Sequence, residues 1–333
     1  MPKPYHQLTN RGKVERLRRM ALKALEQYDL EVTRLSLITN SFNGIFRIDT
    51  PTNVKYILRV NLPEDGHNSD TVHAEAIWLE ALSRDTDLSV PHPLTARNGE
   101  LFVEAAVEGV PEPRLCTIFS WVPGTDLSKH ISTTNIYKLG ILSAQLHRHA
   151  ATFKPPQDFN IPRYDKVFPF PEPVILFDDK FRHLFPPERR EYFQQAVDWT
   201  QEAIDHLVSS DEPMRVIHND LHQWNVRVYR GILSPIDFED LKWGWPVQDI
   251  AITLYYFYGR EDYQELRAAF QRGYSSCSPW PEHYPSEIDA FIASRSVVLA
   301  DFIIQDPNSE WLAQAPLFLE QHANRLVTLL KNR

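Results

Sequence analysis

The sequence predicts an α+β chain in two lobes, with an antiparallel sheet and one long helix in the first lobe and mainly helices in the second. Short runs of β-branched and apolar residues are frequent up to about residue 120. After Gly124 the apolar residues instead recur at helical spacing. A chain of 333 residues is also long enough to form two units. We therefore predict an N-terminal lobe over 1–120, a hinge at about 116–124 and a C-terminal lobe over 125–333.

The N-terminal lobe is expected to begin with a helix and to continue into strands. Leu17, Ala21 and Leu25 lie at helical spacing, which predicts an amphipathic helix over about 12–28. The second and third strands are separated by a Thr-Pro-Thr-Asn turn. The predicted strands cover 34–39, 44–49, 55–60, 101–107 and 115–120, and a second helix covers 71–84. Together these elements predict a small antiparallel sheet with one long helix.

The C-terminal lobe is expected to be helical around an irregular insertion. An apolar stripe from Ile136 to Leu146 has Gly140 beside it, which predicts a helix packed closely against a neighbour. The stretch 151–187 contains eight prolines, which exclude a continuous helix there. Further helices are predicted over 188–207, 249–258, 263–271, 286–304 and 312–330.

The composition is that of an ordinary globular enzyme, with 43% hydrophobic and 24% charged residues. The net charge of −9 predicts no basic surface for nucleic acid. Cys116 and Cys277 form neither a disulfide framework nor a metal-ligand motif. No apolar run approaches the ~20 residues of a membrane span, and no signal-peptide pattern is present. We therefore expect a cytoplasmic protein that binds neither nucleic acid nor membrane, and leave its oligomeric state open.

The most informative pattern lies between Ile217 and Glu239. Asp220 and Asn225 lie in a loop, and Asp237 follows a predicted hairpin of two apolar runs broken at Arg-Gly. Phosphoryl transfer needs a carboxylate to orient and deprotonate a hydroxyl group, and it needs oxygen ligands for the metal ions that bridge the phosphates. Asp220, Asn225 and Asp237 supply these groups in that order.

This pattern resembles the His-x-Asp-x-x-x-x-Asn catalytic loop and the Asp-Phe-Gly metal loop of the protein-kinase-like superfamily. Within it, the chain resembles the aminoglycoside phosphotransferase and choline kinase-like family, near homoserine-kinase-like and stress-response-kinase-like phosphotransferases. The resemblance implies a bilobal protein-kinase-like fold, and transfer of a γ-phosphoryl group from ATP, or GTP, to a hydroxyl group of a small molecule. It assigns Asp220 as the base and Asn225 and Asp237 as Mg²⁺ ligands.

Further residues match the family's nucleotide site. Arg59 stands where the family has a phosphate-binding lysine, and a guanidinium can grip phosphate in a bidentate fork. Glu75 falls on the face of its helix that should be buried, where a carboxylate needs a cation, so we expect an ion pair with Arg59. Asn43 and Gly44 lie in a turn that resembles the family's loose phosphate loop.

The predicted hinge contains Phe119 and Trp121, which resemble the residues that surround adenine in the family. His218 is expected to fix the catalytic loop by hydrogen bonding, whereas the role of His222 is left open. Asp249 is interpreted as an N-cap of the following helix, and the resemblance implies that it braces the catalytic loop, so that both roles can hold at once.

Two further candidates have structural interpretations. His147 is expected to be a core histidine rather than a catalytic one, although the sequence around it resembles a helix of the family. The aromatic run from Tyr255 to Tyr258 is interpreted as core and interface rather than as a substrate box.

The sequence leaves open the identity of the phosphate acceptor and two alternative functions. Only twelve positions separate Asp237 from Asp249, too few for a long activation segment, which favours a small-molecule acceptor over a protein. Acidic or aromatic walls would suit an amine-bearing alcohol. The acidic candidates are Asp178, Asp179, Glu239 and Asp240. The alternatives are a stress-response type of protein Ser/Thr kinase and a pseudokinase binding module, for which the Arg59 substitution is the main argument.

Overall fold

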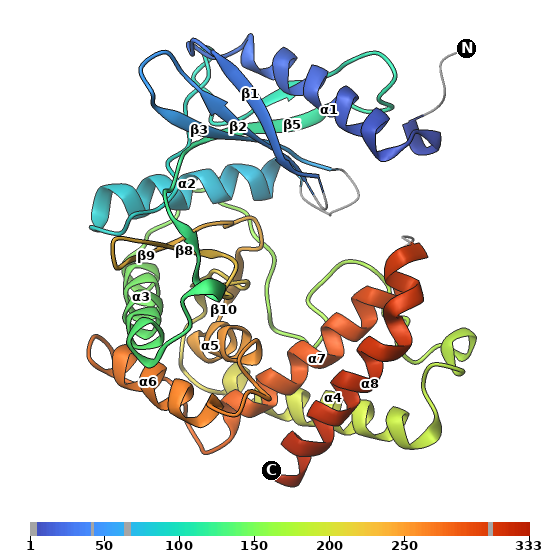
Figure 1. Cartoon of the computed structure of the whole chain (residues 1–333). Coiled ribbons are helices and arrows are strands. Elements are labelled where there is room, and N and C mark those ends of the chain that lie inside the picture. The colour runs from blue at the N-terminus through green and yellow to red at the C-terminus, as the bar shows by residue number, and fades with distance from the viewer. Residues whose placement is uncertain (1–4, 41–42, 63–67, 306–308) are drawn as a thin grey trace. The chain divides into compact units, whose positions relative to one another are not determined.

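The computed structural model describes residues 5–40, 43–62, 68–305 and 309–333. These residues form an α+β fold with a five-stranded antiparallel sheet and eight α-helices, which confirms the predicted fold class (Figure 1). Two compact units are present. The first contains Met1–Gly124, Phe153–Ile161 and Ser234–Glu239, and the second contains Thr125–Thr152, Pro162–Leu233 and Asp240–Arg333. Two segments from beyond the predicted hinge therefore lie in the first unit, and one of them carries Asp237.

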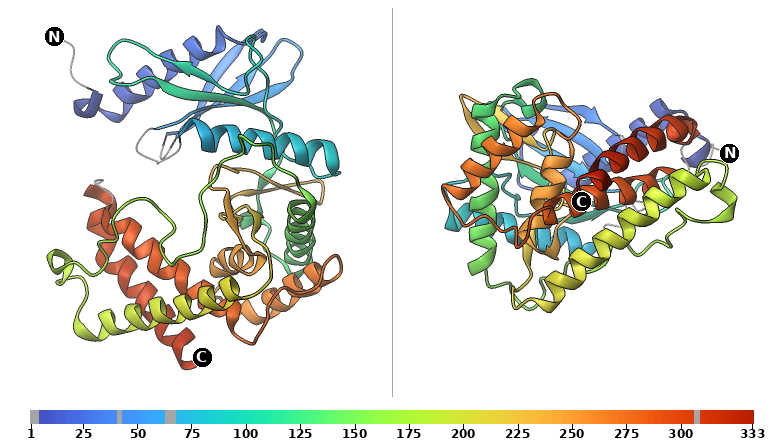
Figure 2. Two further views of the ribbon diagram at one scale, coloured as in Figure 1. Left: turned by 180° about the vertical axis from the view of Figure 1, so that it is seen from behind. Right: turned by 90° about the horizontal axis from the view of Figure 1, so that it is seen from below.

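The first unit is a sheet with a helix on each face (Figure 2). Its elements are α1 (Asn10–Leu25), β1 (Arg34–Thr39), β2 (Gly44–Asp49), β3 (Lys55–Val60), α2 (Ser69–Asp85), β4 (Val103–Ala105) and β5 (Arg114–Ser120). The strands lie in the order β1-β2-β3-β5-β4, and each neighbouring pair is antiparallel. The first three strands have the predicted bounds.

The core of the first unit lies between α1 and one face of this sheet. Leu58 on β3 is paired with Phe46 on β2 and with Ile118 on β5, so these three buried side chains share a face. Leu17 and Met20 of α1 belong to the same buried cluster. Because side chains alternate along a strand, Arg59 points to the opposite face, where α2 lies.

The second unit is mainly helical. Its helices are α3 (Thr133–Thr152), α4 (Pro187–Ser209), α5 (Pro246–Tyr255), α6 (Tyr263–Ser275), α7 (Glu287–Gln305) and α8 (Ser309–Lys331). Its short strands are β6 (Thr125–Asp126), β7 (Arg215–Ile217), β8 (Val226–Tyr229) and β10 (Lys242–Gly244), and β9 (Ile232–Pro235) begins in it. α7 packs against α4, α5 and α8 (Figure 2). No helix in the described ranges is long and apolar enough to cross a membrane.

Glycines determine two local features of this unit. Gly140 on α3 has the backbone of α6 so close that a Cβ there would lie 2.1 Å from the Phe270 carbonyl oxygen, which agrees with the predicted close packing. Between β8 and β9, Arg230 and Gly231 have φ values of 51° and 79°. Two successive positive φ values are typical of a tight hairpin turn, which lies where the sequence predicts a break.

Candidate active site

The catalytic-loop segment begins where β7 ends and holds the carboxylate of Asp220 between three side chains. Arg295 Nη2 lies 2.6 Å from Asp220 Oδ1. Asn225 Nδ2 donates to Asp220 Oδ2 at 2.9 Å and to the Asp220 carbonyl at 3.1 Å. His222 Nε2 lies 3.3 Å from the same Oδ2 atom. Because the Asn225 amide nitrogen points at Asp220, its Oδ1 atom points away and is left for another partner.

Asp249 holds the backbone at the start of this loop. Its carboxylate accepts hydrogen bonds from the backbone N–H groups of His218 at 3.3 Å and Asn219 at 2.7 Å. His147 Nε2 lies 2.9 Å from the same carboxylate, and His147 Nδ1 lies 3.0 Å from the Tyr274 hydroxyl group. Burial acts to raise the pKa of Asp249, but the hydrogen bond and charge of His147 outweigh it and hold that pKa below its ordinary value.

α5 begins at Pro246, and the capping residue is Trp245. The interpretation of Asp249 as the N-cap is therefore wrong. Asp249 lies in the first turn of the helix, where the positive end of the helix dipole stabilises a carboxylate. His218 contributes to the loop as well, since its Nδ1 atom accepts from the Asp220 backbone N–H at 3.3 Å.

His222 is a neutral member of the loop. Its Nδ1 atom accepts from the backbone N–H groups of Asn225 at 3.2 Å and Trp224 at 3.3 Å, which leaves the proton on the Nε2 atom that faces Asp220. Burial, with the nearby charge of Arg295, lowers the pKa of His222 to about 3. His222 is therefore uncharged near neutral pH, with its Nε2 atom facing the Asp220 carboxylate.

Arg295 and Tyr256 are not among the predicted site residues. Arg295 Nη2 lies 3.0 Å from the Tyr256 hydroxyl group, and the Tyr256 ring packs edge-to-face on His222 and on Trp224. The sequence does indicate that Arg295 could be a buried charge, because it is the only basic residue of the apolar helix α7. A buried cation needs an anionic partner, but helical periodicity does not tell which one. Within the aromatic run, Tyr255 and Phe257 are core residues as predicted, whereas Tyr256 lies at this site.

The ion pair expected in the first unit is present. Arg59 Nη1 lies 3.0 Å from Glu75 Oε1, and a second bond joins Nη2 to the other carboxylate oxygen. The pair is buried, with side-chain exposures of 5% and 3%. β3 is a central strand, so Arg59 is not a residue of an exposed edge.

Glu239, one of the acidic candidates for an acceptor wall, is a second carboxylate partner of Arg59. Glu239 Oε2 lies 3.3 Å from Arg59 Nη1 and accepts from Asn43 Nδ2 at 2.8 Å. Burial would lower the pKa of Arg59, but Glu75 and Glu239 offset this effect and raise it. Arg59 is therefore held as a permanent cation, and the Phe119 ring centroid lies 5.2 Å from it.

The turn that is expected to cover phosphates is only partly described, since residues 41 and 42 lie outside the described ranges. Gly44 is the first residue of β2, is paired with Val60 and has no positive φ. A Cβ there would lie 3.3 Å from Leu17 Cδ1, so the glycine allows α1 to approach the sheet. Gly44 therefore follows the predicted turn as the first residue of the strand, and the turn itself lies partly outside the described ranges. The Asn43 side chain accepts from the Leu62 backbone N–H at 3.1 Å.

The remaining predicted residues also lie in the first unit. The Trp121 backbone N–H donates to the Lys55 carbonyl at 3.2 Å. Asp237 has a φ of 66°, an uncommon conformation for a residue other than glycine. The next residue, Phe238, is fully buried, and its ring packs edge-to-face on Trp78 of α2 at 5.6 Å between centroids. Phe238 thus anchors the turn that carries Asp237.

Comparisons with known proteins show which family the chain resembles. A family model described as "Phosphotransferase enzyme family" matches residues 37–286. Amicoumacin kinase from Bacillus subtilis (strain 168) is 26% identical over 234 residues, which cover 70% of this chain and 66% of that protein. The match therefore spans slightly less than two thirds of this relative's length.

Two solved structures share the fold. The microcompartment-associated aminopropanol kinase superposes with a TM-score of 0.77 at 20% identity, covering 94% of this chain and 98% of that one. An amicoumacin kinase with AMP-PNP and Ca²⁺ superposes with a TM-score of 0.71 at 16% identity, covering 95% and 96%. The chain therefore has the same fold as these two kinases.

Proposed function

The chain belongs to the phosphotransferase enzyme family, and from this membership and the catalytic-loop geometry we propose that it transfers the γ-phosphoryl group of ATP or GTP to a hydroxyl group of a small molecule. The observation that carries the proposal is the Asp220 carboxylate. Arg295, Asn225 and His222 orient it, and Asp249 holds the backbone beneath it. An aspartate exposed on the surface usually contacts water, whereas three side chains surround the carboxylate of Asp220.

In the proposed reaction, the acceptor oxygen forms a bond to the γ-phosphorus as the bond to the β–γ bridging oxygen breaks. The nucleoside diphosphate leaves, and the acceptor proton passes to the Asp220 carboxylate. Phosphoryl transfer proceeds through a loose transition state, so orienting the hydroxyl group matters more than a strong base. Arg295 suits this role because its bond to Oδ1 fixes the direction of the Asp220 carboxylate.

The proposed metal is Mg²⁺, with Asn225 and Asp237 as ligands. Mg²⁺ prefers oxygen ligands, and an amide oxygen and a carboxylate are both of this kind. Asn225 fits the assignment because its nitrogen is engaged with Asp220 while Oδ1 points away. When bound, Mg²⁺ neutralises charge on the nucleotide phosphates.

The first unit is proposed to bind the nucleotide. Arg59 would contact the phosphates in place of the usual lysine, with Glu75 holding it in position. Phe119 and Trp121 would contact the base. Asn43 and Gly44 would approach the phosphates through their backbone, since the Asn43 side chain already bonds to Glu239.

The proposed acceptor is an alcohol that binds near Asp220, with Tyr256 and Trp224 as aromatic walls. The Trp224 side chain is exposed, which leaves its ring accessible to a ligand. The aminopropanol named for one structural neighbour carries both an amine and a hydroxyl group. An amine-bearing alcohol suits aromatic faces through cation–π contacts.

The test is nucleoside diphosphate release by the purified chain with Mg²⁺ and either ATP or GTP. The acceptor panel contains amino alcohols, other hydroxyl metabolites and aminoglycosides, with a generic protein substrate as a separate arm. We expect release that depends on a small-molecule acceptor and that Asp220→Asn removes. Asp198→Asn, an exposed change on α4, is the matched control. Release that no acceptor stimulates, or that Asp220→Asn leaves intact, would contradict the proposal.

A further inference from the structure

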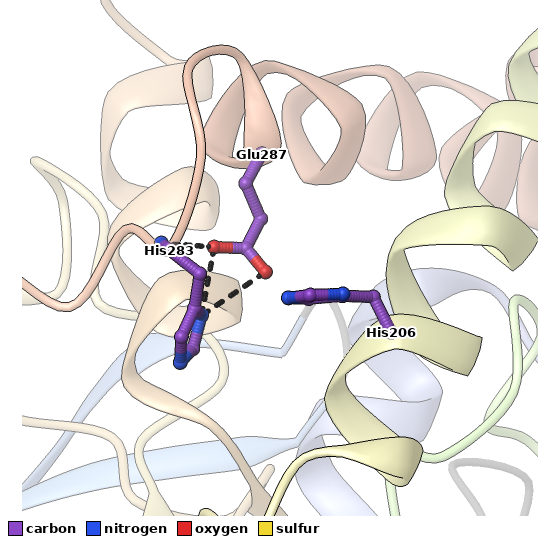
Figure 3. A group of neighbouring side chains, drawn as sticks. All are labelled: His206, His283 and Glu287. Carbon is purple, nitrogen blue, oxygen red and sulfur yellow. Dashed lines mark hydrogen bonds and ion pairs between the residues drawn. The ribbon is translucent and has the colours of Figure 1, made fainter.

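Three potential metal ligands from distant parts of the second unit converge away from the catalytic-loop residues described above. His206 lies near the end of α4, His283 lies in the segment before α7, and Glu287 is the first residue of α7. One ligand atom from each residue lies within 4.8 Å of the others. Figure 3 shows the His206 ring pointing at the Glu287 carboxylate, with His283 beside both.

The distances between these atoms suit a tetrahedral metal ion. His283 Nδ1 lies 3.0 Å from Glu287 Oε2 and 3.3 Å from Oε1. Ligands bound to zinc at about 2.0–2.1 Å in a tetrahedral arrangement are about 3.3 Å apart. His283 and Glu287 therefore already have this separation, and a ligand atom of His206 lies within 4.8 Å of both.

The surroundings of the cluster also resemble those of a metal site. His283 Nε2 lies 3.1 Å from Glu212 Oε2. A metal-binding imidazole usually gives its second nitrogen to a carboxylate in this way, which orients the ring and fixes its tautomer. Glu212 would have this role if His283 bound a metal through Nδ1.

The burial of the Glu287 carboxylate is a separate feature that also indicates a bound cation. Its side chain is 0% exposed. Among the residues that the structure describes, no lysine or arginine bonds to it, and its hydrogen bonds come from the backbone and ring of His283. A fully buried carboxylate needs a cation, and a half-exposed histidine supplies one only when it is protonated.

We propose that His206, His283 and Glu287 form a Zn²⁺ site, with water as the fourth ligand. Two imidazoles and a carboxylate suit zinc, whereas Mg²⁺ prefers oxygen ligands alone, so the site would not compete for the Mg²⁺ of the kinase reaction. The ion would join the end of α4 to the start of α7. Arg295 lies about two turns further along α7, so the site would also support the helix that positions Asp220.

The test measures zinc binding rather than catalysis. The full chain is stripped of metal with a chelator and titrated with ZnCl₂ by calorimetry in a buffer containing excess Mg²⁺. We expect one equivalent to bind and Tm to rise, because a ligand that binds the folded state stabilises it. His206→Ala should weaken binding by more than about tenfold, since it removes a ligand directly and loss of even a supporting contact has that effect.

Two control variants show whether zinc binds at these three residues. His92→Ala removes an exposed histidine of the other unit and should bind zinc like the wild type. Asp220→Asn should also bind zinc normally, so failure of the kinase proposal and failure of the zinc proposal are distinguishable. If His283 is only a protonated partner of Glu212 and Glu287, the wild type will show no saturable zinc binding, or His206→Ala will bind as the wild type does. Either result would overturn the proposal.

Discussion

At the scale of single residues, the site is a set of side chains whose charges and hydrogen bonds fix one another. Arg295 is charged and bonds to Asp220, whereas His222 is kept neutral by burial and by the charge of Arg295. A neutral His222, whose Nε2 atom lies 3.3 Å from the Asp220 carboxylate, does not place a second cation beside Asp220. The loop therefore presents one oriented carboxylate with a defined set of partners.

Replacing Asp220 by Asn should reduce kcat and leave nucleotide affinity intact. The change keeps the shape of the side chain but removes the charge that would accept the proton, and general-base groups contribute about 10²–10⁴-fold in rate. Steady-state turnover and nucleotide affinity should be measured on the same preparation. Joint loss of affinity and turnover would instead assign Asp220 a structural role.

Two buried histidines should make the free energy of unfolding fall in acid. Burial is the main cause that lowers the pKa values of His222 and His322 to about 3 in the folded protein. The pKa of a histidine in an unfolded chain is about 6.5. Between pH 6.5 and 3 the unfolded state therefore binds protons that the folded state does not, so stability decreases as pH falls. Each histidine contributes up to about 1.4 kcal/mol per pH unit.

The measurement is urea denaturation over that pH range. His222→Gln and His322→Gln should each flatten the dependence of unfolding free energy on pH, whatever their effect at pH 7. His92→Gln, a change at an exposed position, should leave the slope as in the wild type. Equal slopes in all four proteins would refute the assignment of neutral histidines.

At the scale of elements, the contact between β3 and α2 depends on charges that are buried away from water. Arg59 is shared by Glu75 of α2 and by Glu239. Two carboxylates on one guanidinium hold it more firmly than a single partner would. The planar fork of a guanidinium can bond to several oxygens at once, which suits Arg59 to two carboxylate partners.

Glu75→Gln should destabilise the protein by about 3 kcal/mol. This value is at the low end of the range for breaking a buried ion pair, because Glu239 would still neutralise Arg59. Nucleotide affinity should also fall, since Arg59 loses one of the bonds that orient it. Thermal and denaturant unfolding together with nucleotide titration would measure both effects. Glu80→Gln, on a half-buried position of α2, should change neither quantity.

The crossing of α3 and α6 should tolerate no added methyl group. A Cβ at Gly140 or at Gly273 would lie 2.1 Å or 1.9 Å from a carbonyl oxygen of the facing helix. Gly140→Ala and Gly273→Ala should each cost about 3 kcal/mol or more of unfolding free energy, at or above the upper end of the usual range for overpacking. Gly12→Ala in α1 is the matched control, where alanine's higher helix propensity should keep the change small. A Gly140→Ala protein as stable as the wild type would show that the helices can separate without cost.

At the scale of the whole molecule, a ligand that binds only the folded chain should raise its Tm. Mg²⁺ and a non-hydrolysable nucleotide should stabilise the wild type together more than either does alone. Asp237→Ala should remove this joint effect and abolish turnover, because it deletes the proposed carboxylate ligand. Thermal unfolding with and without Mg²⁺ measures the effect. A joint stabilisation that survives in Asp237→Ala would reject the metal assignment.

Much of this protein could be predicted from local patterns in its sequence. The first three strands, the turn at Arg230 and the helical nature of the second unit follow from alternation, helical spacing and turn chemistry. The pairing of Arg59 with Glu75 needed the resemblance to the family as well. These signals act over short stretches of the chain, where backbone geometry alone determines which side chains share a face. β7 and β10 were missed because three residues are too few to show alternation.

Only the tertiary structure decided which faces meet. It assigned Glu239 to Arg59, Arg295 to Asp220, and His206 to the same cluster as Glu287. In each case the two partners are separated by 75 or more residues in the sequence. Periodicity shows that a charge is buried but not what neutralises it, because the partner is selected by the packing of elements that are remote in sequence.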